Sequence, residues 1–193
     1  MTIRGLNLAE AAGPSSELAR LYATMSMAAG LAPLHKVAEA YGRRAQEMAQ
    51  NAGGRSDVAW VLEVTGVYRL GVGQWAKAED ALSQAADIAD RLGDQRRCEE
   101  SLTLVPMVHY YQGAFARSAE LFSRSYASTR RSDDPQLHRL RLIGHGMAAF
   151  RLGQMDTTVG LLEAAAALPT TSEPMDRAAE IPHYGLLAVV RLR

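Results

Sequence analysis

Residues 70–94 read LGVGQWAKAEDALSQAADIADRLGD, and this segment predicts a turn, an amphipathic helix and a helix stop. Gly71 and Gly73 favour the turn, because glycine adopts backbone angles that other residues avoid. Gly93 is typical of the left-handed residue that ends a helix. Between the turn and the stop, small or apolar residues recur at the spacing of one helical face, namely Ala78, Leu82, Ala85 and Ala89. We therefore expect a helix over 75–92 whose small face allows a second helix to approach closely.

The same pattern returns at intervals of forty residues. The turn glycine Gly73 has Gly113 and Gly153 as counterparts, whereas the first interval holds Pro33. The small residues of the helical face recur too, as Ala38, Ala78, Ser118 and Thr158, and as Ala45, Ala85, Ser125 and Ala165. A fixed period of about 20–50 residues is typical of solenoids and propellers. The helical spacing within each interval favours the solenoid.

Composition narrows the class of protein. The chain has 193 residues, of which 48% are hydrophobic, and its 21 basic and 21 acidic residues give a net charge of zero. This balance argues against binding to nucleic acid or to a membrane surface through bulk charge. Cys98 is the one cysteine, which excludes a disulfide framework and a cysteine-cluster metal site. With no apolar run of membrane-spanning length and no run like that of a signal peptide, we expect a cytoplasmic protein.

The period divides the chain into a single array of helical hairpins. We expect a partial unit over 1–13, full units over 14–54, 55–93, 94–133 and 134–169, and a partial unit over 170–193. The expected helices lie at about 17–29, 35–51, 57–70, 75–92, 95–112, 115–130, 135–152 and 155–168, with a last helix from about 173. Strand signals are absent. Because both ends fall inside a unit, we expect a piece of a longer array whose uncovered ends are candidates for association.

Local signals place the helix ends. Ser15 or Ser16 is expected to cap the first full helix, and Ser56 or Asp57 the third. The clearest start is at Asp134, because Pro135 follows it at the first helical position. An interior proline costs about 3 kcal/mol and usually kinks a helix. Pro106 therefore predicts a bend or a break near 102–106.

These turns resemble the tetratricopeptide repeat. That family's motif has a glycine, one spacer and an aromatic residue, and then small residues three and ten positions further on. Here the motif is carried by Gly73-Gln74-Trp75 with Ala78, Leu82 and Ala85, by Gly113-Ala114-Phe115 with Phe122, and by Gly146 with Gly153-Gln154-Met155. The chain departs from the family in its forty-residue unit, in Pro106, and in Pro33 and His35 at the first turn.

The resemblance implies a fold and a context. The fold is a right-handed solenoid of helix pairs. The forty-residue variety is similar to arrays at the C-terminal end of large bacterial signalling ATPases, some of which carry a nucleotide cyclase domain and others a helix-turn-helix domain. Neither catalytic part occurs in this sequence, so the resemblance implies a module of a signalling protein, with any ATPase or cyclase activity elsewhere in a parent chain.

A stripe on the first helix of each unit is the candidate binding surface. In arrays of this family the corresponding face lines a concave groove. Met and aromatic side chains in such a groove suit an apolar helix or an extended peptide. The candidate groove residues are Trp60, Glu63, Thr103, Met107, Tyr110, Ile143, Met147 and Phe150. The alternative is that the stripe is core between helices, the interpretation we favour for Val67 and Leu70.

A cluster of arginines is a second candidate surface. Six of them fall within 25 residues, namely Arg117, Arg124, Arg130, Arg131, Arg139 and Arg141. They predict either a basic patch for an acidic partner or a solvated helix face with local ion pairs.

Catalytic signals are weak. The histidines lack the zinc-protease spacing. Cys98 lies near a helix start beside Arg96 and Arg97, which would favour its thiolate, but it has no evident partner. The glycines of residues 71–78 lack the Lys-Ser/Thr ending of a phosphate-binding loop.

The sequence therefore predicts an all-α solenoid of about four helical hairpins with partial units at both ends. Its expected function is protein interaction or regulatory scaffolding, without a cofactor, a metal or catalysis of its own. The expected partner is a protein, a peptide or another domain of the same chain. Two alternatives remain open: an adaptor that forms homodimers through its terminal repeats, and a small-molecule sensor or enzyme with a pocket around His109, Tyr110 and His145.

Overall fold

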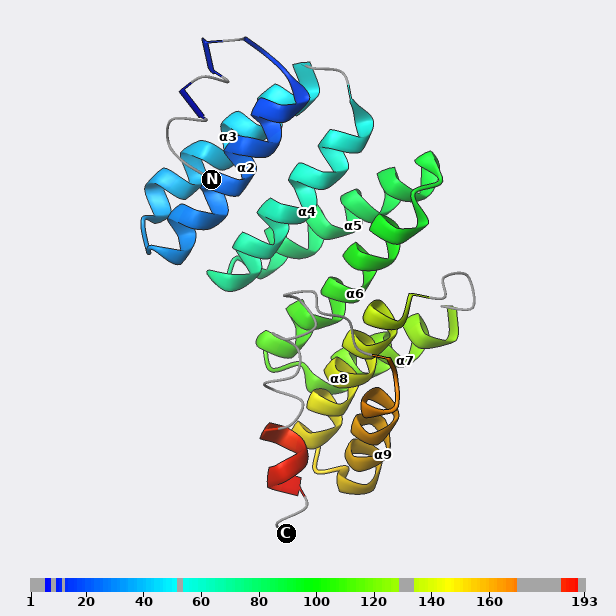
Figure 1. The fold of residues 1–193 in the computed structure, drawn as a ribbon. Helices are drawn as coiled ribbons and strands as arrows, with labels where there is room; N and C mark the ends of the chain where they lie inside the picture. The colour runs from blue at the N-terminus through cyan, green and yellow to red at the C-terminus, as the bar shows by residue number, and fades with distance from the viewer. Residues whose placement is uncertain are drawn as a thin grey trace. The chain divides into compact units, whose positions relative to one another are not determined.

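The computed structural model describes residues 6–7, 10–11, 13–51, 54–128, 134–169 and 185–190, and among these residues all regular secondary structure is helical. The all-α prediction is confirmed for this part of the chain. The chain divides into two compact units, Met1–Ser101 and Leu102–Arg193. Figure 1 shows the helices of each unit, which we describe separately.

The first unit is built from two helical hairpins. In it α2 pairs with α3 and α4 pairs with α5, while α4 also contacts α2 and α3. The helices are α2 (Ser16–Leu31), α3 (His35–Asn51), α4 (Arg55–Gly71) and α5 (Trp75–Leu92), followed by α6 (Gln95–Tyr111), whose first seven residues belong to this unit. Leu18, Ala19, Ala45 and Val61 lie in its main hydrophobic core, together with Leu6.

The second unit continues the same alternation. It contains the rest of α6, then α7 (Phe115–Ser128), α8 (Pro135–Arg151) and α9 (Met155–Ala166). In it α8 pairs with α9 and also contacts α7. Ser118 Oγ of α7 donates to the Pro106 carbonyl of α6 at 2.9 Å, which ties these two helices together.

Most of the predicted helix ends agree with the structure. Ser15 Oγ accepts from Leu18 N at 3.2 Å and caps α2. Asp134 caps α8 by accepting from Gln136 N at 2.9 Å. The predicted cap at Ser56 or Asp57 is wrong, because α4 begins at Arg55 with Gly54 before it. Most of the expected last helix, from about 173, lies outside the described residues, although 185–190 are helical.

The predicted break at Pro106 is wrong as well. Helix α6 runs without interruption from Gln95 to Tyr111 with Pro106 inside it. The missing N–H of proline removes one backbone hydrogen bond, but Pro106 is fully buried and its own carbonyl accepts from Ser118. Packing against α7 therefore keeps the helix continuous, and the alternative expectation of a bend stays a prediction.

The hairpin turns are built alike, as the period predicts. Gly73, Gly113 and Gly153 have φ of 76°, 83° and 75°, which is the left-handed region that favours glycine. The residue after each glycine donates its N–H to the carbonyl five positions earlier, as in Gln74 to Arg69 at 2.9 Å. In the first hairpin Leu34 donates to Ala29 at 2.8 Å in the same way, although Pro33 stands at the glycine position with φ 25°.

The second and fourth hairpins each have a close crossing of their two helices. In the second hairpin Gly66 faces Leu82, and a methyl group on Gly66 would lie 2.9 Å from Leu82 Cγ. In the fourth hairpin Gly146 faces Leu162 in the same register. A small residue on one helix thus makes room for a large one on the other, and this complementarity sets how closely the helices of a hairpin pack.

Arg139 joins the end of the fourth hairpin to α8. It is only 2% exposed, and its Nη2 donates to the Leu168 carbonyl at 2.9 Å and to the Pro169 carbonyl. Hydrogen bonds to a charged group contribute roughly 1.5–3 kcal/mol each, and the desolvation cost of the buried charge offsets part of that.

We expect Arg139→Met to lower the unfolding free energy by about 2 kcal/mol, because the methionine keeps the packing of the stem but leaves both carbonyls without this donor. Urea denaturation followed by circular dichroism measures the loss. Arg124→Met is the matched control, since Arg124 is exposed and, among the described residues, pairs with its neighbour Glu120. Equal midpoints for the two variants would contradict the role assigned to Arg139.

Candidate functional site

The predicted groove residues divide into buried and accessible groups. In the first unit Trp60 and Glu63 of α4 are half-buried. In the second unit Thr103 and Ile143 are 6% and 4% exposed, so they serve packing and offer little surface. The half-buried members of the second unit are Met107 and Tyr110 of α6 and Met147 and Phe150 of α8.

Polar side chains link successive first helices at a repeated position. In the first unit Ser101 Oγ donates to Glu63 Oε2 at 2.9 Å, and Arg97 lies 3.9 Å from the same oxygen. In the second unit Arg141 Nε donates to Thr103 Oγ1 at 2.9 Å. Forty residues separate Glu63 from Thr103 and Ser101 from Arg141, so both links occupy one position of the repeat.

A second link in the first unit lies beside Trp60. Arg20 Nε donates to Asp57 Oδ1 at 2.9 Å, and the Arg20 guanidinium lies 5.7 Å from the Trp60 ring. A hydrogen bond from Ser16 and the pairing with Arg20 hold the pKa of the Asp57 carboxyl below its usual range. Asp57 therefore stays ionised as the partner of Arg20.

Burial raises the pKa of the Glu63 carboxyl, although the Ser101 hydroxyl and Arg97 act in the opposite direction. Because its folded-state pKa is raised, this carboxyl stabilises the fold fully at pH values below its unfolded-state pKa, where it is protonated. This contribution to stability is lost as the pH rises through the folded-state pKa. At neutral pH the ionised Glu63 therefore carries a net cost of burial.

We expect Glu63→Gln to be more stable than the wild type at pH 7, with a smaller difference at pH 4.5, because the amide keeps an acceptor for Ser101 without a buried charge. Urea midpoints of both proteins at the two pH values measure this. Glu47→Gln, at an exposed site of α3, controls for the loss of a charge. If the stability gain of Glu63→Gln over the wild type decreased from pH 4.5 to pH 7, the cost assigned to the buried Glu63 charge would be wrong.

The six arginines do not share one accessible surface. Arg139 and Arg141 are 2% and 3% exposed, so these two do not belong to an exposed basic patch. Arg117 and Arg124 are accessible, and both pair with Glu120, at 2.8 Å and 3.2 Å. These two ion pairs agree with the alternative prediction, a solvated helix face with local ion pairs. Arg130 and Arg131 lie outside the described residues.

The other candidate reactive groups from the sequence are Cys98 and the histidines. Cys98 is 8% exposed and packs against Ala86 and Ala89, and a thiol buried in apolar surroundings is a poor nucleophile. Burial lowers the pKa of the His145 imidazole, which favours its neutral form. Within the described ranges, no group of three or more His, Cys, Asp or Glu side chains is placed to hold a metal ion.

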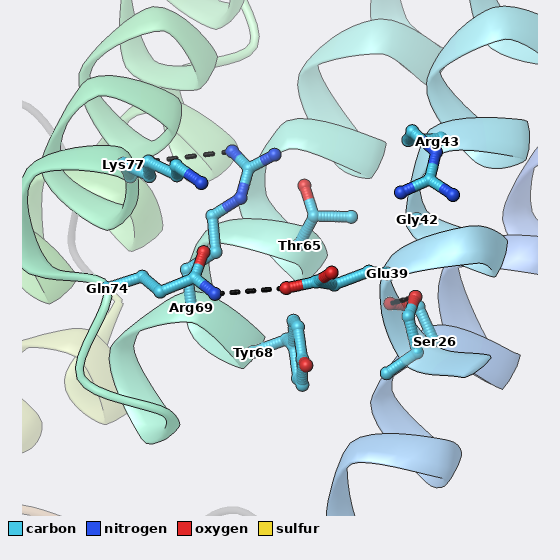
Figure 2. A pocket seen from close by; sticks show the side chains of 10 residues that line it. Ser26, Glu39, Gly42, Arg43, Thr65, Tyr68, Arg69, Gln74 and Lys77 are labelled. Carbon is cyan, nitrogen blue, oxygen red and sulfur yellow. Dashed lines mark hydrogen bonds between the residues drawn. The ribbon is translucent and has the colours of Figure 1, made fainter. Parts of the chain in front are cut away.

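One hollow of the first unit lies among α2, α3, α4 and the start of α5 (Figure 2). Its volume is about 200 Å³. Figure 2 shows Glu39 and Arg43 of α3 facing Thr65 and Arg69 of α4 across it. Gln74 and Lys77 contribute from the start of α5.

The hollow carries more positive than negative charge. Its lining includes the cations Arg43, Arg69 and Lys77 and one carboxylate, Glu39. Gln74 Nε2 donates to Glu39 Oε1 at 3.2 Å, and Arg69 Nη1 donates weakly to the Lys77 carbonyl at 3.5 Å. The arrangement is thus an accessible concave site with an excess of cations.

None of the candidate groove or basic-patch residues predicted from the sequence lines this hollow. A signal for it is nevertheless present in the repeat register, where Gly42 occupies the position of Leu82, Phe122 and Leu162. A pocket was also expected around His109, Tyr110 and His145. None of these three residues lines any of the three hollows found in the first unit.

Comparison of the chain with protein-family models and with curated protein sequences yields no match. The resemblance to tetratricopeptide repeats therefore rests on the residues quoted for it. None of the described helices combines the length and the apolar character that a membrane span requires.

Proposed function

We propose that this chain is a tetratricopeptide-like solenoid module that binds a segment of a partner protein. The observation that carries the proposal is the set of half-buried methionine and aromatic side chains on α6 and α8 of the second unit: Met107, Tyr110, Met147 and Phe150. They stand at the repeat positions predicted for a binding face. The partner is another protein or another domain of the same chain.

The chemistry of this face favours an apolar segment as its occupant. Methionine adapts its shape to different apolar surfaces. Tyr110 is held by aromatic neighbours, with ring centres 5.5 Å from those of Tyr111 and Phe115. Met147 packs against the core formed by Leu142, Ile143 and Ala165. A rigid support beneath adaptable side chains suits an amphipathic helix with its apolar side turned toward α6 and α8.

Peptides selected on the full chain from a random library displayed on phage test this function. We expect selection of peptides with apolar residues at helical spacing, and binding weakened at least about tenfold by Met107→Gln or Met147→Gln, because these side chains would be buried by the peptide. Thermal unfolding of each variant verifies folding. Arg124→Gln, on an exposed face of α7, is the control and should leave the affinity unchanged.

Two results would overturn the proposal. One is the absence of any enriched peptide after selection on the folded chain. The other is a set of enriched peptides whose affinity is the same for Met107→Gln, Met147→Gln and wild type.

A second candidate function is self-association as an adaptor, and one observation favours it. Leu31, Leu34 and Val37 at the tip of the first hairpin are 80%, 55% and 43% exposed. The corresponding positions of the second hairpin hold Gly71, Gln74 and Lys77. Sedimentation equilibrium distinguishes the candidates, since this one requires a dimer that Leu31→Gln with Leu34→Gln dissociates.

A further inference from the structure

The hollow among α2, α3 and α4 lies at a hairpin crossing where the repeat has a glycine in place of a large side chain. At the hairpin crossing, the second helix contributes Leu82, Phe122 and Leu162 in the later hairpins but Gly42 in the first. Opposite Gly42 stands Ser26, whose Oγ would lie 3.3 Å from a methyl group at position 42. Both residues at this crossing are small and stand close together, and the hollow opens beside them.

The cations around this space lack anionic partners. Arg43 and the Lys77 ammonium make no ion pair or hydrogen bond with the described residues, and the Arg69 guanidinium makes only its weak bond to the Lys77 carbonyl. The single carboxylate of the lining, Glu39, already accepts from Gln74. Charges of +3 and −1 leave an excess of +2 around the hollow.

This combination is specific to the junction of the first two hairpins. The three cations stand at positions 43, 69 and 77. One period later these positions hold Ser83, His109 and Arg117, and two periods later Ser123, Ala149 and Thr157. The cations and the missing side chain therefore coincide at one place in the array and at no other full junction.

Two of the neutral hydroxyl groups of the hollow already donate to backbone carbonyls. Ser26 Oγ donates to the Ala38 carbonyl at 2.8 Å, and Thr65 Oγ1 donates to the Val61 carbonyl at 2.7 Å. Burial and the Glu39 charge raise the pKa of the Tyr68 phenol, which therefore stays neutral. The charged donors available to a ligand are those of the three cations, two of which are guanidinium groups suited to bidentate contacts with phosphate oxygens.

We propose that this hollow binds a phosphate dianion, either free or as the phosphate group of a small ester. The charge of the dianion matches the excess of +2, and its oxygens match the fork of donors on Arg43 and Arg69. The site does not depend on the peptide-binding face of the second unit, so each proposal stands or fails by itself.

Isothermal titration of the full chain with inorganic phosphate and with phenyl phosphate, at fixed ionic strength, tests the site. We expect saturable binding of one phosphate group per chain and a loss of about tenfold in affinity for Arg43→Gln and for Arg69→Gln. Tighter binding of phenyl phosphate identifies an ester as the better ligand, and equal binding identifies the free ion. Arg124→Gln is the control and should bind like the wild type.

Gly42→Leu is the sharpest variant, because it supplies the side chain that the other hairpins have. We expect it to abolish binding by occupying the hollow, and thermal unfolding verifies that the variant folds. Gly42→Ala gives a smaller version of the same change if leucine proves too large. Saturable binding that survives in both Gly42→Leu and Arg43→Gln, or no saturable binding of either probe at millimolar concentration, overturns the proposal.

Discussion

Replacing Ala78 with glutamate is expected to unfold the second hairpin. Ala78 is 0% exposed on the face of α5 that packs against α4. A carboxylate at this position would be buried without a partner, and a charge without compensation in the core costs several kcal/mol. We expect a loss of at least about 4 kcal/mol, which places this substitution among the most damaging of single changes.

Ala76→Glu provides a matched control two residues away. Ala76 is exposed in the first turn of α5, where a carboxylate interacts favourably with the helix dipole. Far-ultraviolet circular dichroism during urea denaturation compares the two variants. Equal stability of Ala78→Glu and wild type would show that the assigned repeat register is wrong.

The second large effect is expected at Gly144, where α8 meets α7. A methyl group on Gly144 would overlap the Phe122 ring at Cζ, and this ring is only 1% exposed. The enclosed ring cannot move aside freely, so Gly144→Ala should lower the unfolding free energy by about 2–3 kcal/mol. This loss outweighs the gain of about 1 kcal/mol in helix propensity.

A double variant separates the clash from other causes. Phe122→Leu removes the ring atoms that the new methyl group would meet, so Gly144→Ala should cost much less in that background. Gly160→Ala on α9 is the control, because nothing lies within 4 Å of its added methyl group, and it should stabilise the chain by about 1 kcal/mol. A Gly144→Ala protein as stable as Gly160→Ala would contradict the packing described at this crossing.

Much of the helical pattern could be predicted, because the repeat supplied several independent examples of one unit. The predicted helix over 75–92 agrees with α5 to the residue, and the turns at Gly73, Gly113 and Gly153 have the expected left-handed angles. Asp57 was the exception among the caps. A carboxylate near a helix start looks the same in sequence whether it caps its own helix or, as here, pairs with Arg20 of a preceding helix.

The candidate sites were harder to predict, because they depend on contacts between units of the repeat. Arg139 and Arg141 looked like surface residues, yet Arg139 satisfies backbone carbonyls near the end of α9 and Arg141 reaches Thr103. The hollow beside Gly42 is lined by residues of several helices, including cations on three of them. Such a site becomes visible only when the repeat register is compared position by position.

The links between successive first helices have a consequence for how the array assembles. At one repeat position the pairs are Ala23 with Val61, Glu63 with Ser101, and Thr103 with Arg141, the first being apolar residues of one core cluster. Repeat proteins with similar units risk misassembly in which a hairpin docks on the wrong neighbour. A fourth hairpin docked on the first would place Arg141 against Ala23, which offers its side chain no hydrogen bond. The change of side chains at this position therefore disfavours the docking of the fourth hairpin on the first.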